Sequence, residues 1–130
     1  MKLVSIIMTC FNGEKYLQES ISSILSQYYQ NWELIFVDNN STDKSKEILS
    51  DFKDKRIRYF KLNSTVNLGK IRKFAFLKCR GELISFLDVD DYWDKLKLKD
   101  QVKIFETNKN ADIVYSNYYQ LNSGDLKKNT

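Results

Sequence analysis

The sequence predicts an α/β fold with a mostly parallel sheet flanked by helices. Apolar runs of strand length, such as Leu3–Met8 and Leu83–Leu87, alternate with stretches of helical periodicity. The clearest helical stretch is Glu14–Tyr28, where apolar residues recur at spacings of four, three and four residues from Leu17 to Tyr28. Short breaks separate these segments, which is typical of parallel strands joined by crossover helices.

Each expected element follows from its local pattern. Strands are expected at Leu3–Met8, Trp32–Val37, Ile57–Leu62, Leu83–Leu87 and Ala111–Tyr115, because these are short apolar or half-apolar runs. A helix is expected at Glu14–Tyr28, and a second after the cap-forming residues Ser41-Thr42-Asp43, with Ile48, Leu49 and Phe52 on one face. A third is expected at Lys70–Lys78, whose core face holds Ile71, Phe74, Ala75 and either Leu77 or the stem of Lys78. A fourth is expected around Leu98, Val102 and Phe105.

Length and composition limit the class of protein. A chain of 130 residues with 42% hydrophobic residues fits one domain with a substantial core. The absence of histidine excludes a Ser-His-Asp triad, a Cys-His pair and a histidine metal site. The two cysteines, Cys10 and Cys79, are far apart and predict neither a disulfide framework nor a zinc site. We therefore expect a cytoplasmic protein, with the inner face of the membrane as an alternative location.

The net charge of +4 raises the question of an anionic partner. Basic residues gather at 53–58 and 95–103, but acidic residues are mixed among them and no nucleic-acid motif is present. We expect no nucleic-acid partner and interpret these residues as solvated faces with some attraction for phosphates. A peripheral contact with an anionic membrane remains an alternative.

Three carboxylates follow the apolar run Leu83–Leu87 in the segment Asp88-Val89-Asp90-Asp91. Carboxylates crowded at the end of a buried strand repel one another unless a cation or solvent compensates them. Mg²⁺ and Mn²⁺ prefer oxygen ligands and commonly take one or two protein carboxylates together with phosphates. The segment therefore indicates a divalent-metal site, and the alternative is a solvated loop or a helix start capped by aspartate.

Polar segments also follow the first two predicted strands. Thr9-Cys10-Phe11-Asn12 follows the first, and Asp38-Asn39-Asn40-Ser41-Thr42-Asp43 follows the second. Ligands of open parallel sheets bind beyond the carboxyl ends of the strands, so these segments and Asp88–Asp91 are expected at one site.

These three segments, together with the strands that precede them, closely resemble the family 2 glycosyltransferases over Lys2 to about Tyr119. The resemblance implies the GT-A fold, with a Rossmann-like nucleotide-binding sheet. It also implies transfer of a sugar from a nucleotide-sugar donor, usually a UDP-sugar, to an acceptor hydroxyl with inversion at the anomeric carbon. The setting it implies is polysaccharide or glycolipid biosynthesis, with a saccharide or lipid-linked acceptor.

The resemblance places nucleotide-binding roles on Thr9, Phe11 and Asn12, with Glu14 nearby. It places recognition of the base, usually uracil, on Asp38. A carboxylate is a good acceptor for the imide N–H of uracil, while a helix cap is the alternative role for Asp38.

The resemblance assigns the diphosphate to Arg72, although the surrounding segment departs from the family pattern and Lys70 or Lys73 are alternatives. It assigns Asp88 to the ribose side of the nucleotide, and Asp90, supported by Asp91, to the Mn²⁺ or Mg²⁺ cofactor. Tyr92 and Trp93, which come next, either wall the sugar pocket or pack in the core.

The general base for inverting transfer has no candidate in this sequence and is expected beyond Thr130. We interpret residues 1–120 as the nucleotide-sugar-binding part of a truncated GT-A domain. Residues 121–130 are either a polar tail, with a turn at Asn122–Asp125, or the start of the missing acceptor-binding half. Apolar surface left uncovered predicts self-association into a homo-oligomer. The alternative function is a non-catalytic nucleotide-sugar-binding or assembly module.

Overall fold

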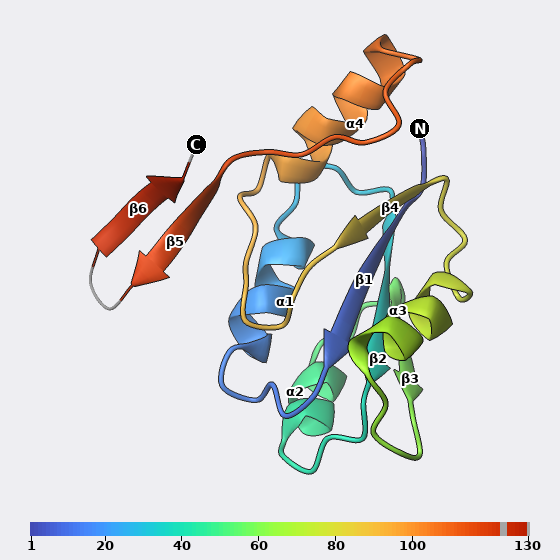
Figure 1. The fold of residues 1–130 in the computed structure, drawn as a ribbon, viewed down its shortest axis with the longest axis vertical. Helices are drawn as coiled ribbons and strands as arrows, with labels where there is room; N and C mark the ends of the chain where they lie inside the picture. Colours follow the sequence, from blue (N-terminus) through green and yellow to red (C-terminus); the bar gives the residue numbers. More distant parts are fainter. Residues whose placement is uncertain (123–124, 130) are drawn as a thin grey trace.

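The computed structural model describes residues 1–122 and 125–129. A parallel four-stranded sheet has the order β3-β2-β1-β4, as Figure 1 shows. Its strands are β1 (Val4–Cys10), β2 (Trp32–Asp38), β3 (Ile57–Lys61) and β4 (Leu83–Phe86). The helices are α1 (Leu17–Leu25), α2 (Ser45–Asp51), α3 (Leu68–Phe76) and α4 (Lys97–Thr107). The antiparallel strands β5 (Tyr118–Asn122) and β6 (Asp125–Asn129) form a separate hairpin. The α/β architecture expected from the sequence is confirmed.

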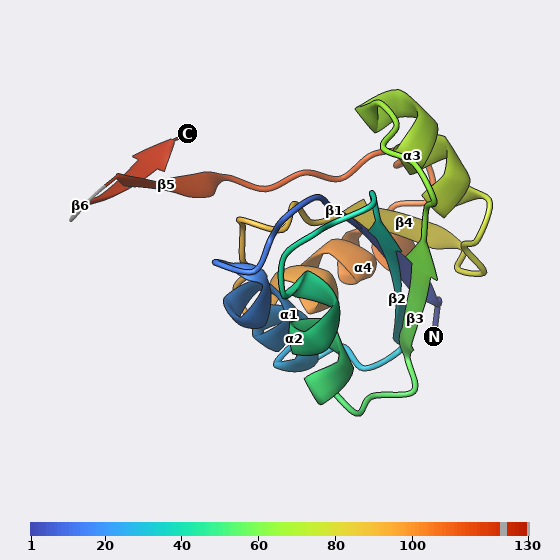
Figure 2. The ribbon, with the colours of Figure 1, turned by 90° about the horizontal axis from the view of Figure 1, so that it is seen from below.

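Two apolar cores cover the two faces of the sheet. Ile6 and Met8 of β1 pack in the larger core with residues from α1, α2 and α4, whereas Ile7 packs in the smaller core with Ile71 and Ala75 of α3. Figure 2 shows α1 and α2 on one side of the sheet and α3 on the other. Because successive side chains of a strand point to opposite faces, the continuous apolar runs of β1 and β2 serve both cores.

The predicted helices differ from the observed ones mainly at their ends. The first begins at Leu17 because the N–H groups of Tyr16 and Leu17 both donate to the carbonyl of Gly13 and close a turn there. The third begins earlier than expected, since the Asn67 side chain caps it by accepting from Lys70 N–H. Leu77 lies outside the core with 71% exposure, and the ammonium of Lys78 lies over the rings of Phe60 and Phe74.

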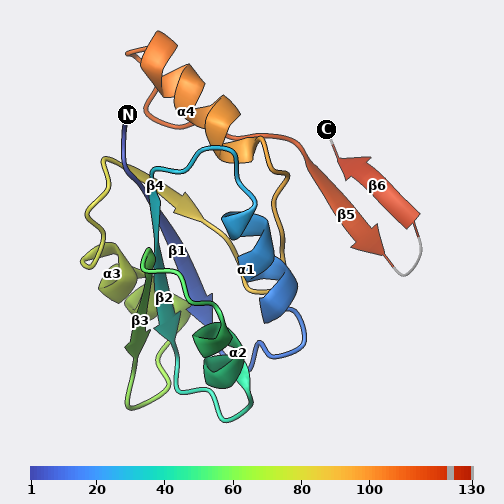
Figure 3. The same ribbon diagram turned by 180° about the vertical axis from the view of Figure 1, so that it is seen from behind.

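The expected strand at Ala111–Tyr115 is wrong. Residues 111–117 are irregular, and Ile113 and Tyr115 are 83% and 88% exposed. Within the described residues this segment pairs with no strand of the sheet, so its alternating apolar residues have no face to cover. The nearest strand in sequence is β5, and Figures 1 and 3 show the β5–β6 hairpin standing away from the four-stranded sheet.

The C-terminal segment, expected as a polar tail or as the start of the acceptor-binding half, contains a strand. Residues 125–129 form β6, with Asn122 facing Asp125 in the register of the hairpin. Ser123 and Gly124 of the expected turn, and Thr130, lie outside the described residues. No helix in the described part of the chain has both the length and the apolarity needed to cross a membrane.

A buried polar network fastens the turn before β4 to the sheet. The Glu33 carboxylate accepts hydrogen bonds from Ser5 Oγ at 2.7 Å, Arg58 Nη1 at 2.9 Å and the Arg80 N–H at 2.7 Å. Gly81 N–H donates to Ser5 Oγ at 2.8 Å. Burial alone would raise the pKa of Glu33, but the hydrogen bonds from Ser5, Arg80 and Arg58 outweigh it and lower that pKa.

Replacing Glu33 with Gln should lower the free energy of unfolding by about 2 kcal/mol at pH 7, because charge-assisted hydrogen bonds are lost. The depressed folded-state pKa gives stability that is complete above the pKa of an unfolded glutamate, about 4.3, and is lost as the pH falls through the folded value. The difference between the two proteins should therefore shrink below about pH 4. Urea denaturation over a pH series measures this. The exposed Glu106→Gln is the control, and an equal effect of both substitutions at pH 7 would contradict the account.

Candidate functional site

A cavity of about 200 Å³ lies where β1 and β2 end and α3 begins. Its lining consists of Thr9, Cys10, Phe11, Asn39, Leu68 and Ile71. Thr9 and Phe11 were predicted as nucleotide-binding residues. Cys10 and Asn39 belong to the segments expected at the site but were given no role there, Ile71 was expected in the core, and Leu68 was not predicted. The Asn39 side chain also donates to the carbonyl of Val66 and accepts from its N–H, at 2.8 and 2.9 Å, which holds the segment leading into α3 over the strand ends.

Asn12 joins the loop after β1 to the loop after β2. Its N–H donates to Ser41 Oγ at 3.0 Å, and its side-chain oxygen accepts from Thr42 N–H at 2.9 Å. Its φ of 51° lies in the left-handed region, which asparagine tolerates better than most residues. In this structure the side chain of Asn12 is therefore engaged between the two loops, and Asn12 is not among the residues that line the cavity.

The same two loops hold each other at the start of α2. Gly13 N–H donates to Ser45 Oγ at 2.9 Å, and Glu14 N–H donates to Asp43 Oδ2 at 2.9 Å. In return, the Glu14 carboxylate accepts from Lys44 N–H at 3.0 Å. Glu14 thus satisfies a free N–H at the start of α2, which is a structural role distinct from the expected contact with a nucleotide.

Asp38 lies at the end of β2 with 2% exposure and outside the lining of the cavity. Its Oδ1 accepts from Ser41 N–H at 2.7 Å, and its Oδ2 accepts from the Tyr59 hydroxyl at 2.9 Å. Asp43 and Glu14 provide the hydrogen bonds at the start of α2, so Asp38 is not the cap of that helix. Each carboxylate oxygen keeps a lone pair for a further donor.

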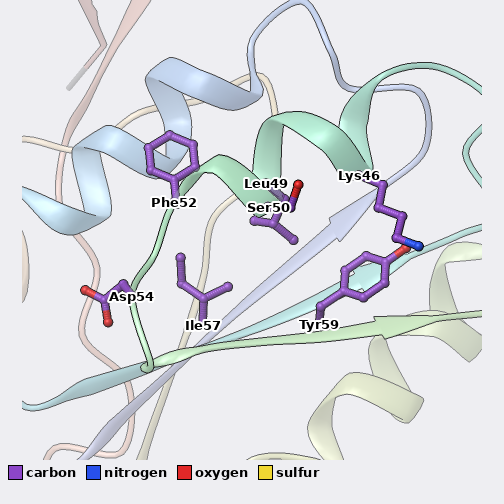
Figure 4. A pocket seen from close by; sticks show the side chains of 7 residues that line it. All are labelled: Lys46, Leu49, Ser50, Phe52, Asp54, Ile57 and Tyr59. Carbon is purple, nitrogen blue, oxygen red and sulfur yellow. The ribbon is translucent and has the colours of Figure 1, made fainter.

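Burial, followed by the hydrogen bond to Asp38, raises the pKa of Tyr59. The Tyr59 hydroxyl therefore stays protonated at neutral pH and continues to donate to Asp38. The ring of Tyr59 lines a second cavity of about 210 Å³ between α2 and β3, which Figure 4 shows with Lys46, Phe52 and Asp54 around it. That cavity contains none of the nucleotide or metal residues expected from the sequence.

The acidic loop after β4 presents exposed carboxylates from Asp88, Asp90 and Asp91. Burial, and then the charges of Asp90 and Asp88, raise the pKa of Asp91. Leu96 N–H, next to the start of α4, is satisfied by Asp94, so the three aspartates do not cap that helix. In the part of the chain that the structure describes, no three acidic, cysteine or histidine groups could enclose a metal ion.

This arrangement fits a metal that takes one or two protein carboxylates and completes its shell with phosphates and water, as Mg²⁺ and Mn²⁺ commonly do. Burial contributes most to the raised pKa of Asp91, and the negative charges of Asp90 and Asp88 add to it. A divalent cation would relieve the repulsion among these carboxylates.

Arg72 of α3 reaches the same place from the other face of the sheet. Its guanidinium lies 3.5 Å from Asp88 Oδ1 and 5.7 Å from the centre of the Phe86 ring. Both charged groups are well exposed, so the pair adds little stability and leaves Arg72 available to a phosphate. Lys70 and Lys73 on the same helix are also exposed.

The two aromatic residues after the acidic loop have different surroundings. Trp93 packs against the larger core, and the ammonium of Lys97 lies 5.2 Å from the centre of its ring. Tyr92 is exposed. Packing therefore accounts for Trp93. For Tyr92, a position beside the donor sugar stays a prediction.

Residues 5–130 of the chain match the sequence profile of the family described as glycosyl transferase family 2. The chain belongs to this family. An Escherichia coli relative, UDP-Glc:alpha-D-GlcNAc-diphosphoundecaprenol beta-1,3-glucosyltransferase WfaP, is 40% identical over 92% of the chain and 47% of its own length. A second E. coli enzyme of the same description, WfgD, is 36% identical over 95% of the chain and 49% of its own length. The chain thus spans about half the length of these curated relatives.

Solved structures show the same fold. S. aureus TarS 1-349 in complex with UDP-GlcNAc superposes with a TM-score of 0.79 at 31% identity, over 84% of this chain and 32% of that one. The mannosyltransferase PcManGT from Pyrobaculum calidifontis, in complex with GDP-Man and Mn²⁺, matches with a TM-score of 0.72 over 77% of this chain and 31% of that one. Its 21% identity supports the fold alone.

Replacing Gly13 with Ala should destabilise the protein by about 1–3 kcal/mol, because the new methyl group must displace its neighbours. A Cβ at Gly13 would lie 2.6 Å from Val89 Cγ2 and 2.9 Å from Cys10 Sγ. Gly69→Ala is the matched control, since the nearest atom to its Cβ is Asn67 Oδ1 at 3.6 Å. Alanine in that helix should be neutral or stabilise by up to about 1 kcal/mol. Thermal unfolding measures both, and equal melting temperatures would contradict the close packing of Gly13 on the acidic loop.

Proposed function

We propose that the chain is the donor-binding part of a metal-dependent, inverting glycosyltransferase that uses a UDP-sugar. One observation carries this proposal. The cavity lined by Thr9 and Phe11, the guanidinium of Arg72 and the acidic loop all lie at the carboxyl edge of the sheet. Cation, aromatic and carboxylate groups together suit a nucleoside diphosphate. The descriptions of the E. coli relatives as UDP-Glc-dependent and of TarS as a UDP-GlcNAc complex support UDP as the nucleotide.

Each part of the donor meets a different residue in this proposal. Asp38, fixed by Ser41 and Tyr59, accepts from the imide N–H of the base, and Asp88 binds the ribose. Arg72 pairs with the diphosphate through its planar donors, exchanging its weak contact with Asp88 for the phosphate oxygens. Thr9 and Phe11 line the cavity that receives the nucleotide.

Asp90, supported by Asp91, would hold Mn²⁺ or Mg²⁺ at the diphosphate. When bound, the cation stabilises the negative charge that develops on the departing nucleoside diphosphate. The positive charge of Arg72 attracts the diphosphate, and the repelling carboxylates of the acidic loop attract the cation. Together they favour binding of the diphosphate and the metal as a pair over binding of either one alone.

The acceptor is proposed from the relatives. The two E. coli enzymes are described as acting on a diphosphoundecaprenol-linked sugar, so a lipid-linked saccharide acceptor in polysaccharide or glycolipid biosynthesis is proposed for the whole protein. Residues 1–120 would supply the donor side of that reaction. The alternative of a non-catalytic nucleotide-sugar-binding module is separated by turnover, which only an enzyme shows.

The proposal predicts that this chain binds UDP at least tenfold more tightly with Mn²⁺ than with a chelator, because the cation links the diphosphate to Asp90. Asp90→Asn should abolish that difference, whereas Asp100→Asn on the exposed face of α4 should keep it. Calorimetric titration of UDP and GDP under both conditions measures the effect. Binding that ignores Mn²⁺ and Asp90, or the absence of nucleotide binding, would overturn the proposed donor site.

A further inference from the structure

Helix α1 carries buried polar residues on one side of its apolar face. Ser20, Ser23 and Gln27 are spaced by three and four residues, so they form a continuous polar stripe along the helix and just beyond its end. All three are buried, and Gln27 has 0% exposure. Buried polar groups that face an apolar core are costly unless each finds a partner. The partners of this α1 polar stripe all belong to the segment that contains the acidic loop or to the helix itself.

The contacts run along residues 88–98 from end to end. Ser20 Oγ donates to the carbonyl of Asp88 at 3.4 Å, and Ser23 Oγ accepts from Trp93 N–H at 3.1 Å. Gln27 Nε2 donates to the carbonyl of Asp94 at 2.7 Å. Figures 1 and 3 show the chain after β4 running beside α1 along this line.

Gln27 holds the far end of the segment with its whole amide. Its Nε2 also donates to the carbonyl of Ser23 at 3.1 Å, and its Oε1 accepts from Leu98 N–H at 3.0 Å, near the start of α4. The neighbouring Tyr28 N–H donates to the carbonyl of Lys95 at 3.0 Å. Both amide hydrogens and the amide oxygen of Gln27 are therefore used, which fixes its orientation.

The helix does not depend on these bonds for its own place on the sheet. Leu17, Ile21 and Ile24 hold α1 in the larger core through apolar contacts. The polar stripe instead ties irregular backbone, which has few hydrogen bonds of its own, to that fixed helix. The carboxylates of the acidic loop project from backbone that is held at Asp88 on one side and at Trp93 and Asp94 on the other.

We propose that Gln27, with Ser20 and Ser23, is a positioning residue that pre-orders the acidic loop for the metal–diphosphate group. The inference rests on the proposed function of that loop. Ligands that are held in place before binding need not be ordered when the cation arrives, and their outer partners commonly control metal affinity. Gln27 touches neither metal nor nucleotide in this role.

The test compares Gln27→Leu with wild type in the 130-residue chain. Leucine is of similar size but leaves the Asp94 carbonyl and the Leu98 N–H without their partner. The measured quantity is the ratio of the UDP dissociation constants with chelator and with Mn²⁺. We expect Gln27→Leu to reduce this ratio about tenfold while the constant in chelator stays unchanged, in line with second-sphere effects on metal affinity.

Gln18→Leu is the matched control, because Gln18 lies on the exposed face of α1. It should keep the wild-type ratio. If Gln27→Leu does not fold, Ser23→Ala removes only the hydroxyl that Trp93 N–H contacts, and a reduction of about threefold is expected.

Each outcome separates the inference from the proposed function. A folded Gln27→Leu or Ser23→Ala with the wild-type ratio would show that the stripe serves stability alone. A loss of UDP affinity equal in chelator and in Mn²⁺ would point to a general disturbance and would also overturn the inference. If wild type shows no response to Mn²⁺, the proposed function fails and the inference fails with it.

Discussion

The site depends on reciprocal hydrogen bonds between the loops after β1 and β2. Backbone N–H groups of Asn12 and Glu14 donate to Ser41 and Asp43, and the side chains of the first two residues accept from the second loop in return. Irregular backbone near a sheet edge would otherwise leave these polar groups to water. We call these hydrogen bonds between the two loops the clamp. The clamp holds the loop that carries Thr9 and Phe11, which line the cavity, and Ser41 of the second loop also donates its N–H to one oxygen of Asp38.

The parallel sheet brings the remaining parts to the same edge. All four strands run in one direction, so the chain leaves each of them at the edge where the clamp lies. The acidic loop after β4 then closes against the clamp through Gly13, whose missing side chain leaves room for Val89. From the opposite face, α3 brings Arg72 to Asp88. Elements from both faces of the sheet thus bring charged side chains to one site.

Much of this arrangement follows from the sequence because it depends on local pattern. The strands β1 and β2 were predictable since they are apolar runs buried on both faces, and the polar segments after them predicted a ligand site at the carboxyl edge of the sheet. The segment at 111–115 is also rich in apolar residues, yet it pairs with no strand among the described residues. Strand formation depends on a partner, which a local pattern does not contain.

The hydrogen-bond partners of individual side chains could not be predicted from the sequence for a related reason. Asn12 and Glu14 have the residue types of a nucleotide site, but their hydrogen bonds go to residues about thirty positions away in the second loop. Gln27 gave no signal, although Ser20, Ser23 and Gln27 repeat at helical spacing beside the apolar stripe. A polar stripe of this kind becomes informative only when the fold shows which segment it faces.

An NMR titration of the isotope-labelled chain with UDP and Mn²⁺ would show directly whether the nucleotide and the metal bind at the acidic loop. Paramagnetic broadening by the cation falls off steeply with distance, so it locates the metal without reference to activity. A metal bound at Asp90 should give the strongest broadening at the amides of residues 88–91, with Thr9, Phe11 and Arg72 also affected. Broadening centred on the second cavity, at Lys46 and Asp54, would contradict a single donor site at the carboxyl edge of the sheet.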